Sequence, residues 1–487
     1  MNRRIVIFSL ICLIVIQHVS SGEINHLSSD DSLNIDKMQT NILIGIYRIR
    51  DLSINVHKPF FHLQFQIDSK QYIVNFPLEG PDAYWECSWP AATITVDYDQ
   101  ETPIPIDISL YYSSSSDGRK KICDISNTNR YNLSIQYDVK RGEWIGDDFL
   151  KDETGYGHSS GFEDENKLEN DCEIWFDIKQ GKPGEDPEMS WYSDDRLTPW
   201  EILNLYDINM SDDHSKTDFD NDLIPTSWED KYGYDPFIFE DHKHLDADND
   251  GLNNFEEWKT NHWFSDPFAQ DIFLEVDWMK SKYHFLKDYR LSKRSQQLLM
   301  TTFTKEKITL HIDDGWMGGG GDSIPYDKSL TIKDIEGIRM KYFFQGDPEN
   351  WKKGVFRYAI MGSQIELESM DYIAGGISIY FDTIGIGVHY IKTHFMCLLH
   401  SRFDSDISIA SGLMHELGHT LGITPLNTPG CDKSGNPFHK DFWIYGNYYS
   451  AMNFRYVYNL IDFSHGNNGE NDWDDWSNLD LTLINKA

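Results

Sequence analysis

The stretch that decides the fold of the C-terminal part of the chain is HELGHTLGITPLNTPGCD, residues 415–432. It opens with two histidines four positions apart, His415 and His419, and Glu416 follows the first of them. On a helix, residues four apart lie one turn apart on the same face, so both imidazoles project together. Imidazole nitrogens suit zinc, and a neighbouring carboxylate can take a proton from water that zinc has acidified. The pattern predicts a zinc site with His415 and His419 as ligands and Glu416 as the general base.

The residues around this motif predict the helix that carries it. The stretch SDISIASGLMHELGHTLG, residues 405–422, begins with Ser405 and Asp406 as candidate N-caps and ends at Gly422, a favourable residue just after a helix. Its apolar residues recur at helical spacing: Ile409, Leu413, Met414, Leu417 and Leu421. We therefore expect an amphipathic helix from 405 to 421 with one buried face.

With Gly422 the motif reads H-E-x-x-H-x-x-G, and in this form it resembles the metzincin zinc peptidases. In that family the chain turns at the glycine and a third ligand follows three residues later. That position is Pro425 here, which offers no ligand atom. Some relatives carry an insertion before the third ligand, and some use an aspartate. The resemblance therefore implies a later third ligand: Asp432 is the expected one, His439 the alternative, and His465 a further candidate.

A second stretch strengthens this resemblance. NYYSAMNFRY, residues 447–456, is similar to the metzincin Met-turn, in which a methionine packs beneath the metal, and Met452 would be that residue. The family often has a tyrosine two positions after the methionine, where this chain has Phe454. The hydroxyl that would help to stabilise a tetrahedral oxyanion is thus left open between Tyr449 and Tyr456.

An acidic loop precedes the zinc region. In DADNDGLNNFEE, residues 246–257, carboxylates stand at loop positions one, three and five, a glycine at position six and a glutamate at position twelve. Position seven offers its backbone carbonyl. Calcium prefers such a set of hard oxygen ligands. The loop predicts a calcium site formed by Asp246, Asp248, Asp250, Leu252 and Glu257.

The same pattern occurs 28 residues earlier, in DFDNDLIPTSWE, residues 218–229. Here Leu223 replaces the glycine and would strain a left-handed turn. The first copy along the chain, around Glu201, has lost its carboxylates and is interpreted as a structural remnant, so residues 218–229 form the second loop and residues 246–257 the third. The units are similar to thrombospondin type 3 or dockerin-like repeats, and a fixed period marks tandem units. The predicted calcium ligands of the second loop are Asp218, Asp220, Asp222 and Glu229.

Upstream of the repeats, short segments alternate between apolar and polar residues without a helical period. Such segments between turn signals are typical of a β-sandwich. We expect strands in ILIGIYRI (42–49), FFHLQFQI (60–67), QYIVNFP (71–77), ATITVDY (92–98), IPIDISLYY (104–112), YNLSIQYDV (131–139) and CEIWFDI (172–178).

The block from residue 269 onward changes in character. DIFLEVDWM (271–279) and ITLHID (308–313) are typical of buried strands, the stretch 286–303 between them of a helix, and GGISIYFD (375–382) of another strand. The predicted architecture is multidomain. It comprises a signal peptide (1–22), an all-β sandwich (38–180), calcium-binding loop-helix repeats (185–268) and an α/β metzincin-like zinc domain (269–487).

Composition limits the partners. The 487 residues include 79 acidic and 43 basic ones, a formal charge of −36, which argues against nucleic acid or an anionic membrane as a partner. Arg3 and Arg4 precede an apolar run that ends before Ser21 and Gly22, the pattern of a cleaved secretory signal. We therefore expect a secreted or cell-surface protein that has no membrane association after cleavage.

Together these patterns predict a secreted zinc endopeptidase that acts on protein or peptide substrates and is stabilised by calcium. The stretches DIFLEVDWM, HELGHTLG, AMNFRY and NDWDDWSNLDL (471–481) resemble exported archaeal and bacterial proteins with such a domain combination. The alternative is a calcium-stiffened extracellular binding or adhesion protein with an inactive zinc-peptidase domain. Pro425 favours the alternative, whereas the intact Glu416 argues against it. A zinc hydrolase of non-peptide bonds is a third hypothesis.

Overall fold

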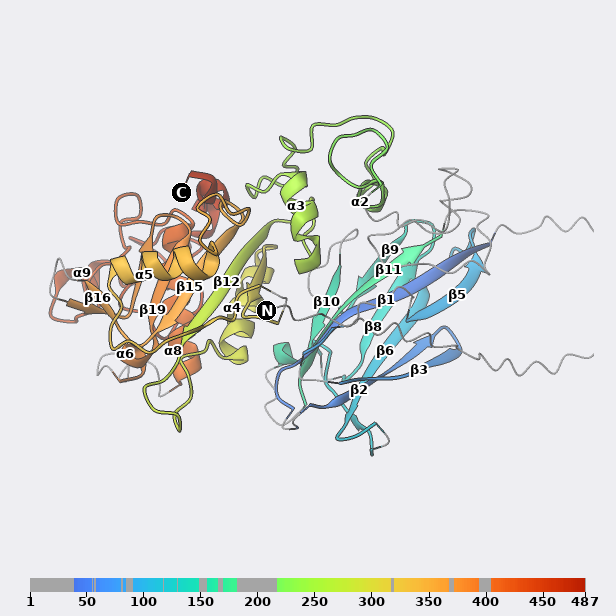
Figure 1. Cartoon of the computed structure of the whole chain (residues 1–487), viewed down its shortest axis with the longest axis horizontal. Helices are drawn as coiled ribbons and strands as arrows, with labels where there is room; N and C mark the ends of the chain where they lie inside the picture. The colour runs from blue at the N-terminus through green and yellow to red at the C-terminus, as the bar shows by residue number, and fades with distance from the viewer. Residues whose placement is uncertain are drawn as a thin grey trace, which may run out of the picture. The chain divides into compact units, whose positions relative to one another are not determined.

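The computed structural model describes residues 39–54, 56, 58–79, 82–84, 91–116, 118–128, 130–148, 156–164, 170–181, 217–316, 319–367, 372–393 and 404–486. The predicted signal peptide, residues 1–22, and the repeat around Glu201 lie outside the described residues. In the described parts the chain is rich in β-sheets and has few helices (Figure 1).

Two antiparallel sheets form the N-terminal region (Figure 1). One has the order β10-β11-β1-β4, with β5 also paired to β1; the other has the order β3-β2-β6-β8-β9, with β7 also paired to β6. Their strands are β1 (Gln39–Asp51), β2 (Phe60–Ile67), β3 (Lys70–Glu79), β4 (Asp82–Tyr84), β5 (Ala92–Asp97), β6 (Ile104–Ser113), β7 (Lys121–Ile122), β8 (Leu133–Asp138), β9 (Glu143–Gly146), β10 (Gly157–Ser160) and β11 (Cys172–Gln180).

Alternating apolar residues explain why these sheets pack face to face. In β6, buried Ile104, Ile106, Ile108 and Leu110 alternate with less buried residues, so one face of the strand is apolar. Residues of both sheets, such as Ile44 and Phe65, share one hydrophobic core. All seven segments expected to be strands are strands, and the sandwich is confirmed at this level. The strands of these two sheets that the sequence did not predict, β4, β7, β9 and β10, have at most four residues each.

Short helices follow the acidic loops of the middle region. α2 (Thr226–Tyr232) follows the loop that starts at Asp218, and α3 (Asn254–Thr260) follows the loop that starts at Asp246. Asn253 caps α3 and forms a capping box with Glu256, which satisfies backbone donors that the helix leaves unpaired. The turns η1 (Gly161–Asp164) and η2 (Asn261–Trp263) are the other helical turns described before residue 271.

The C-terminal sheet is mixed. Its path is β13-β12-β15-β19-β18, with β14 beside β12; β18 at the edge is antiparallel to β19, and the other pairings are parallel. The strands are β12 (Asp271–Met279), β13 (Thr309–Asp313), β14 (Ser323–Ile324), β15 (Phe356–Gly362), β18 (Gly376–Ile379) and β19 (Thr383–Gly387), and β16 (Ile365–Leu367) pairs with β17 (Tyr372–Ala374) apart from this sheet.

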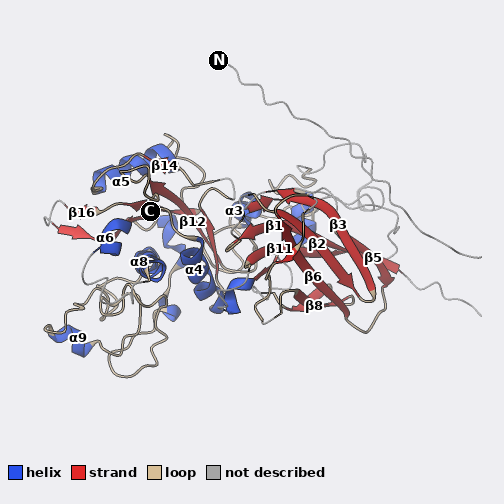
Figure 2. Cartoon of the chain, turned by 90° about the horizontal axis from the view of Figure 1, so that it is seen from below, coloured by secondary structure: helices blue, strands red, loops and turns tan. Residues whose placement is uncertain are grey.

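Helices cover this sheet on two sides. Figure 2 shows α5 (Ile332–Ile338) on one side of β12, with α4 (Lys293–Lys305) and α8 (Ser405–Thr420) on the other. Alternate residues of β12 explain the arrangement: Leu274 and Val276 belong to the core with α4 and α8, whereas Phe273 belongs to the core with α5. The helical elements are α4 (Lys293–Lys305), α5 (Ile332–Ile338), η3 (Arg339–Phe343), α6 (Val388–Thr393), α8 (Ser405–Thr420), α9 (Lys440–Ile444), η5 (Trp476–Asn478) and η6 (Leu481–Lys486).

Two details of the expected helices need correction. The helix expected over 286–303 begins only at Lys293, because the Ser292 hydroxyl accepts a hydrogen bond from Ser295 N and caps the helix there. The N-cap of α8 is Asp404 rather than Ser405 or Asp406, since the Asp404 carboxylate accepts from the backbone N–H groups of the next turn.

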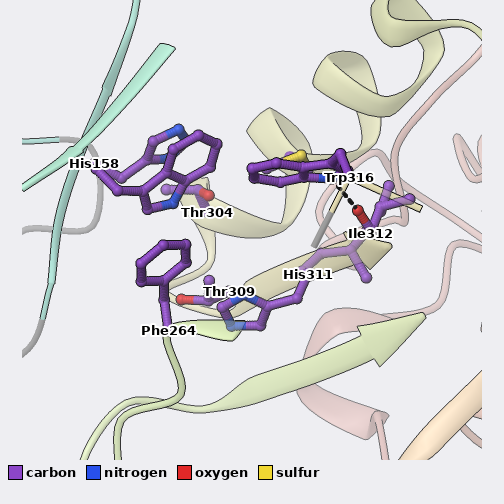
Figure 3. Close-up of a pocket in the computed structure, with 10 residues that line it drawn as sticks. His158, Phe264, Thr304, Thr309, His311, Ile312 and Trp316 are labelled. Atoms are coloured by element: carbon purple, nitrogen blue, oxygen red, sulfur yellow. Dashed lines mark hydrogen bonds between the residues drawn. The ribbon is translucent and has the colours of Figure 1, made fainter. Parts of the chain in front are cut away.

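A small pocket with a mainly aromatic wall lies in the hydrophobic core (Figure 3). The rings of His158 and Trp175 stack with centroids 4.4 Å apart, and the indole N–H of Trp316 donates to the Ile312 carbonyl at 2.9 Å. The residues that line it include none of the predicted metal ligands. Among the described helices, none is long and apolar enough to cross a membrane.

Candidate functional site

Helix α8 presents the two histidines of the opening motif. His415 and His419 lie one turn apart with ring centroids 4.8 Å apart, and the rings are nearly perpendicular. The helix is buried along most of its length, and His415 is only 4% exposed. The amphipathic pattern thus places the two imidazoles at a buried end of the helix, just before the turn at Gly422, whose φ is 94°.

Backbone carbonyls fix the orientation of both rings. His415 Nδ1 lies 2.8 Å from the Ala451 carbonyl oxygen, and His419 Nδ1 lies 2.7 Å from that of Ile423. A carbonyl can only accept, so each Nδ1 carries the proton and donates it. The proton-free Nε2 of each neutral ring is then available as a ligand, as in most histidine metal sites.

Asp432 meets these two nitrogens. Its Oδ1 lies 3.1 Å from His415 Nε2 and 3.6 Å from His419 Nε2, and one ligand atom from each of the three residues falls within 4.8 Å of the others. Oδ1 is buried and has no hydrogen-bond partner. Two imidazole nitrogens and one carboxylate oxygen form a donor set that suits zinc and leaves a fourth position for water or substrate. The residues present therefore fit the predicted metal.

The charges at this site influence one another. Burial acts to raise the pKa of Asp432, but the adjacent His415 and His419 outweigh it and hold this pKa well below its usual range. Burial acts to lower the pKa of His419, but Asp432 and Glu416 raise it to about 9. The cluster therefore attracts positive charge, which a proton or a metal cation can supply.

Glu416 lies beside the ligands. It is 7% exposed, and burial raises its pKa despite the nearby His415 and His419. A carboxyl pKa that burial raises is closer to the range in which a group both accepts and returns a proton near neutral pH. Gly376, at the start of β18, lies against it, since a Cβ on Gly376 would be 2.5 Å from Glu416 Oε1.

The turn around Met452 packs against α8 and holds two of the candidate ligands. Met452 is fully buried, and a Cβ on Gly418 would lie 2.4 Å from its sulfur, so the turn packs directly against α8. The Met452 carbonyl accepts a hydrogen bond from Asp432 N at 3.0 Å, and the preceding carbonyl of Ala451 accepts from His415. One turn thus positions two of the three candidate ligands.

The other third-ligand candidates lie in different surroundings. His439 is an N-cap residue of α9, its side chain is 51% exposed, and Nδ1 lies 3.4 Å from Asp441 Oδ2. His465 Nε2 lies 3.4 Å from Glu306 Oε1. Cys431 is a buried free thiol whose pKa burial raises. The structure brings Asp432, and not His439 or His465, together with the two helix histidines.

The tyrosines near the Met452 turn differ in their surroundings. Tyr456 donates its hydroxyl to the Gly446 carbonyl, and its ring stacks on Tyr449 at 4.8 Å. The hydroxyl of Tyr458 lies against Gly375, the residue just before β18, since a Cβ on Gly375 would lie 2.1 Å from its oxygen. Sequence reasoning missed Tyr458 and Gly376, and no spacing signal connects either residue to the motif on α8.

The acidic loop 246–257 folds around its carboxylates. Asp246, Asp248 and Asp250 each provide an oxygen within 4.8 Å of the others. Backbone N–H groups of the loop donate to these carboxylates, for example Gly251 N to Asp246 Oδ2 at 3.1 Å. Gly251 has the left-handed backbone that the pattern requires, with φ of 97°. Leu252, expected to offer its carbonyl, is buried next to it.

Negative charge accumulates in this loop. Glu257 on α3 is 1% exposed, and neither of its carboxylate oxygens has a hydrogen-bond partner. Burial together with neighbouring carboxylates raises the pKa of Asp248 to about 9 and that of Asp250 to about 8. Such crowding costs free energy that a divalent cation would offset.

The second loop has the same carboxylate group, with Asp218, Asp220 and Asp222 within 4.8 Å of one another. Leu223 has φ of 86°, the left-handed conformation that Gly251 takes in loop 246–257. The strain that the sequence indicated at this leucine is therefore present. Glu229 on α2 completes the predicted ligand set and is fully buried.

Comparisons with known proteins give little guidance. No protein-family model and no curated protein matches the chain. A solved C2 domain is similar at 8% identity over 30% of this chain and 99% of its own, with a TM-score of 0.17. Human GIVD cytosolic phospholipase A2 in complex with methyl gamma-linolenyl fluorophosphonate is similar at 10% identity over 30% of this chain and 18% of its own, with a TM-score of 0.18. A C2 domain of plant extended synaptotagmin 1 is similar at 10% identity over 30% of this chain and 97% of its own, also with a TM-score of 0.18. At these TM-scores the likenesses carry no argument about function.

Proposed function

We propose that the protein is a zinc-dependent endopeptidase with a metzincin-like catalytic domain, secreted or exposed at the cell surface. The observation that carries the proposal is the convergence of His415 Nε2, His419 Nε2 and Asp432 Oδ1 beside a buried glutamate. A purely structural zinc site has no need of a general base, and a fourth protein ligand usually closes such a site.

The proposed mechanism gives the three metal ligands and Glu416 different roles. Zinc, when bound, supplies a Lewis acid that acidifies water and polarises a carbonyl oxygen. His415, His419 and Asp432 would hold it; the Met452 turn orients His415 and Asp432, and the Ile423 carbonyl orients His419. Glu416 accepts the proton of the attacking water and later delivers it to the leaving amine, because its buried carboxyl has a raised pKa.

The position of β18 favours a polypeptide substrate. β18 is the edge strand of its sheet path, and its first residue lies against Glu416. An extended peptide can add to such an edge through main-chain hydrogen bonds, and this places a scissile bond next to the general base. A compact ester or amide would make no use of the edge.

We further propose that loop 246–257 binds calcium. The three aspartates, the unpartnered oxygens of Glu257 and the left-handed Gly251 form an oxygen site of the kind that calcium prefers. Calcium that binds only the folded loop would stabilise the middle region and reduce its self-digestion.

Hydrolysis of labelled casein tests the peptidase proposal, with zinc content measured on the same samples. Glu416→Gln is expected to lower kcat/KM by at least about 100-fold with zinc retained, since general acid–base catalysis typically contributes this much. Glu349→Gln, a change at an exposed carboxylate, is the matched control and should retain full activity.

Two results would count against the proposal. If neither the wild type nor Glu416→Gln hydrolyses casein although zinc is bound, the result favours the hypothesis of a binding or adhesion protein. If the wild type cleaves esters or small amides but not casein, the hydrolase acts on a different class of bond.

A further inference from the structure

His242 lies against the second acidic loop, although the sequence pattern gave it no role. Its Nε2 is 3.0 Å from Asp222 Oδ2, 3.8 Å from Glu229 Oε1 and 4.0 Å from Glu240 Oε2. Asp222, Glu229 and His242 each offer a ligand atom within 4.8 Å of the others. This group shares no residue with the centre at His415, and the inference does not depend on peptidase activity.

All three side chains are withdrawn from water. Asp222, Glu229 and His242 are 4%, 0% and 1% exposed. Neither oxygen of Glu229 has a hydrogen-bond partner, nor does His242 Nε2, although that nitrogen faces three carboxylates. Buried polar atoms without partners cost free energy, so such a group of converging atoms indicates a ligand that satisfies them together.

The surroundings of the imidazole hold it in place. Tyr234 and Trp228 meet the ring edge to face, with centroids 5.0 Å and 6.2 Å away. Asn254 Nδ2 lies 2.9 Å from His242 Nδ1, while Asn254 Oδ1 is buried without a partner. Turning this amide over brings Oδ1 against Nδ1, which then carries the proton and leaves the Nε2 lone pair facing the carboxylates. This is the usual outer contact of a metal-binding histidine.

The neighbouring loop provides a comparison. In loop 246–257 the acidic residue next to the aspartate ladder is Asp271, whose charge acts on Asp250 and Glu257. The ligand atoms that loop 246–257 offers are therefore oxygens, as calcium prefers. In the second loop His242 contributes a nitrogen, and imidazole ligands favour zinc and other first-row transition ions over calcium.

From these contacts we propose that Asp222, Glu229 and His242 bind a divalent transition-metal ion, zinc by their donor chemistry, with Glu240 in reach as a fourth ligand. Donors about 2.0 Å from a tetrahedral zinc lie about 3.3 Å from each other. His242 Nε2 lies 3.0 to 4.0 Å from the carboxylate oxygens, a range that includes this donor–donor distance. Small side-chain shifts would close the shell.

Such an ion would link three segments of the middle region. Asp222 belongs to the loop, Glu229 to α2, and His242 to the segment that leads to the third loop. His242 is also tied to α3 through Asn254. A transition ion here would fix the second unit against the third, in addition to the calcium proposed for loop 246–257.

The test uses the untagged full chain with His415→Ala and His419→Ala, so that the first centre is disabled. Cobalt(II) is titrated in excess calcium, and visible absorption reports nitrogen and oxygen coordination. We expect one cobalt ion per chain, displaced by zinc. His242→Gln should weaken zinc binding at least about 100-fold, since even an outer-shell change costs 10- to 100-fold.

His244→Gln is the matched control, because the His244 side chain is 81% exposed and lies 2.8 Å from Asp241. The His244→Gln variant should bind zinc as tightly as the host protein does. Equal zinc affinity of the host and His242→Gln, displacement by calcium at equal concentration, or no zinc binding by the host would overturn the proposal. If His242→Gln fails to fold, X-ray absorption at the zinc edge of the host decides: one imidazole is expected, and an all-oxygen shell refutes the assignment.

Discussion

Replacing Gly376 by alanine should disable Glu416 without removing the metal. The added Cβ would lie 2.5 Å from Oε1, 2.7 Å from Cγ and 2.9 Å from Cδ of Glu416. Nonbonded heavy atoms settle at about 3.5 Å, so the carboxylate must move by roughly 1 Å. The side chain is buried, and a shift of this size at a catalytic group can cost about 100-fold in rate. This corresponds to about 2.7 kcal/mol of barrier.

The assay is kcat for casein hydrolysis together with zinc content and thermal stability. Zinc content should stay at the wild-type level, because the close contacts of the new methyl group involve Glu416 and none of the three metal ligands. Gly337→Ala on α5 is the matched control: no atom lies within 4 Å of its added Cβ, so activity should be unchanged. Full kcat in Gly376→Ala with zinc bound would refute the assignment of Glu416 as the base.

Three further predictions follow from the structure. Asp432→Ala should weaken zinc binding at least about 100-fold, whereas His439→Ala should leave it unchanged because His439 lies at the exposed start of α9; competition with a chelator measures both, and the reverse order would overturn the choice of ligand. Chelation of calcium should make residues 215–268 more sensitive to protease, read by mass spectrometry of the fragments, and unchanged protection would contradict the calcium assignment. Burial lowers the pKa of His311 to about 3, so at this residue the unfolded chain takes up a proton below about pH 6.5 and the folded chain does not. This residue alone should therefore lower the free energy of unfolding by about 2 kcal/mol between pH 7 and pH 5. Urea unfolding at both pH values measures it as the difference between the wild type and His311→Gln, and an equal pH dependence of the two proteins would contradict it.

Local patterns predicted the elements that depend on neighbours in the sequence. The spacing of His415 and His419 required only the geometry of a helix, and β12 has the predicted bounds because its nine residues are all buried. The prediction of a helix over residues 286–303 was wrong for residues 286–292, since apolar spacing alone did not reveal that Ser292 would cap the helix.

Features that depend on tertiary contacts could not be derived in the same way. Asp432 reaches the histidines through a backbone with φ of 56° and a hydrogen bond to the Met452 carbonyl, and the sequence left it as one of several candidates. The contact between Gly376 and Glu416 joins an edge strand to a helix, and His242 meets Asp222 across an intervening helix. No periodicity connects such pairs.

The zinc site of α8 is tested most directly by the zinc content of the full chain and of the His415→Ala/His419→Ala double variant, measured by elemental mass spectrometry after dialysis. We expect the double variant to hold about one zinc fewer per chain than the wild type, whatever zinc other sites retain. Equal zinc content in the two proteins would show that the histidines of α8 hold no metal, and the proposed peptidase mechanism would fail with it.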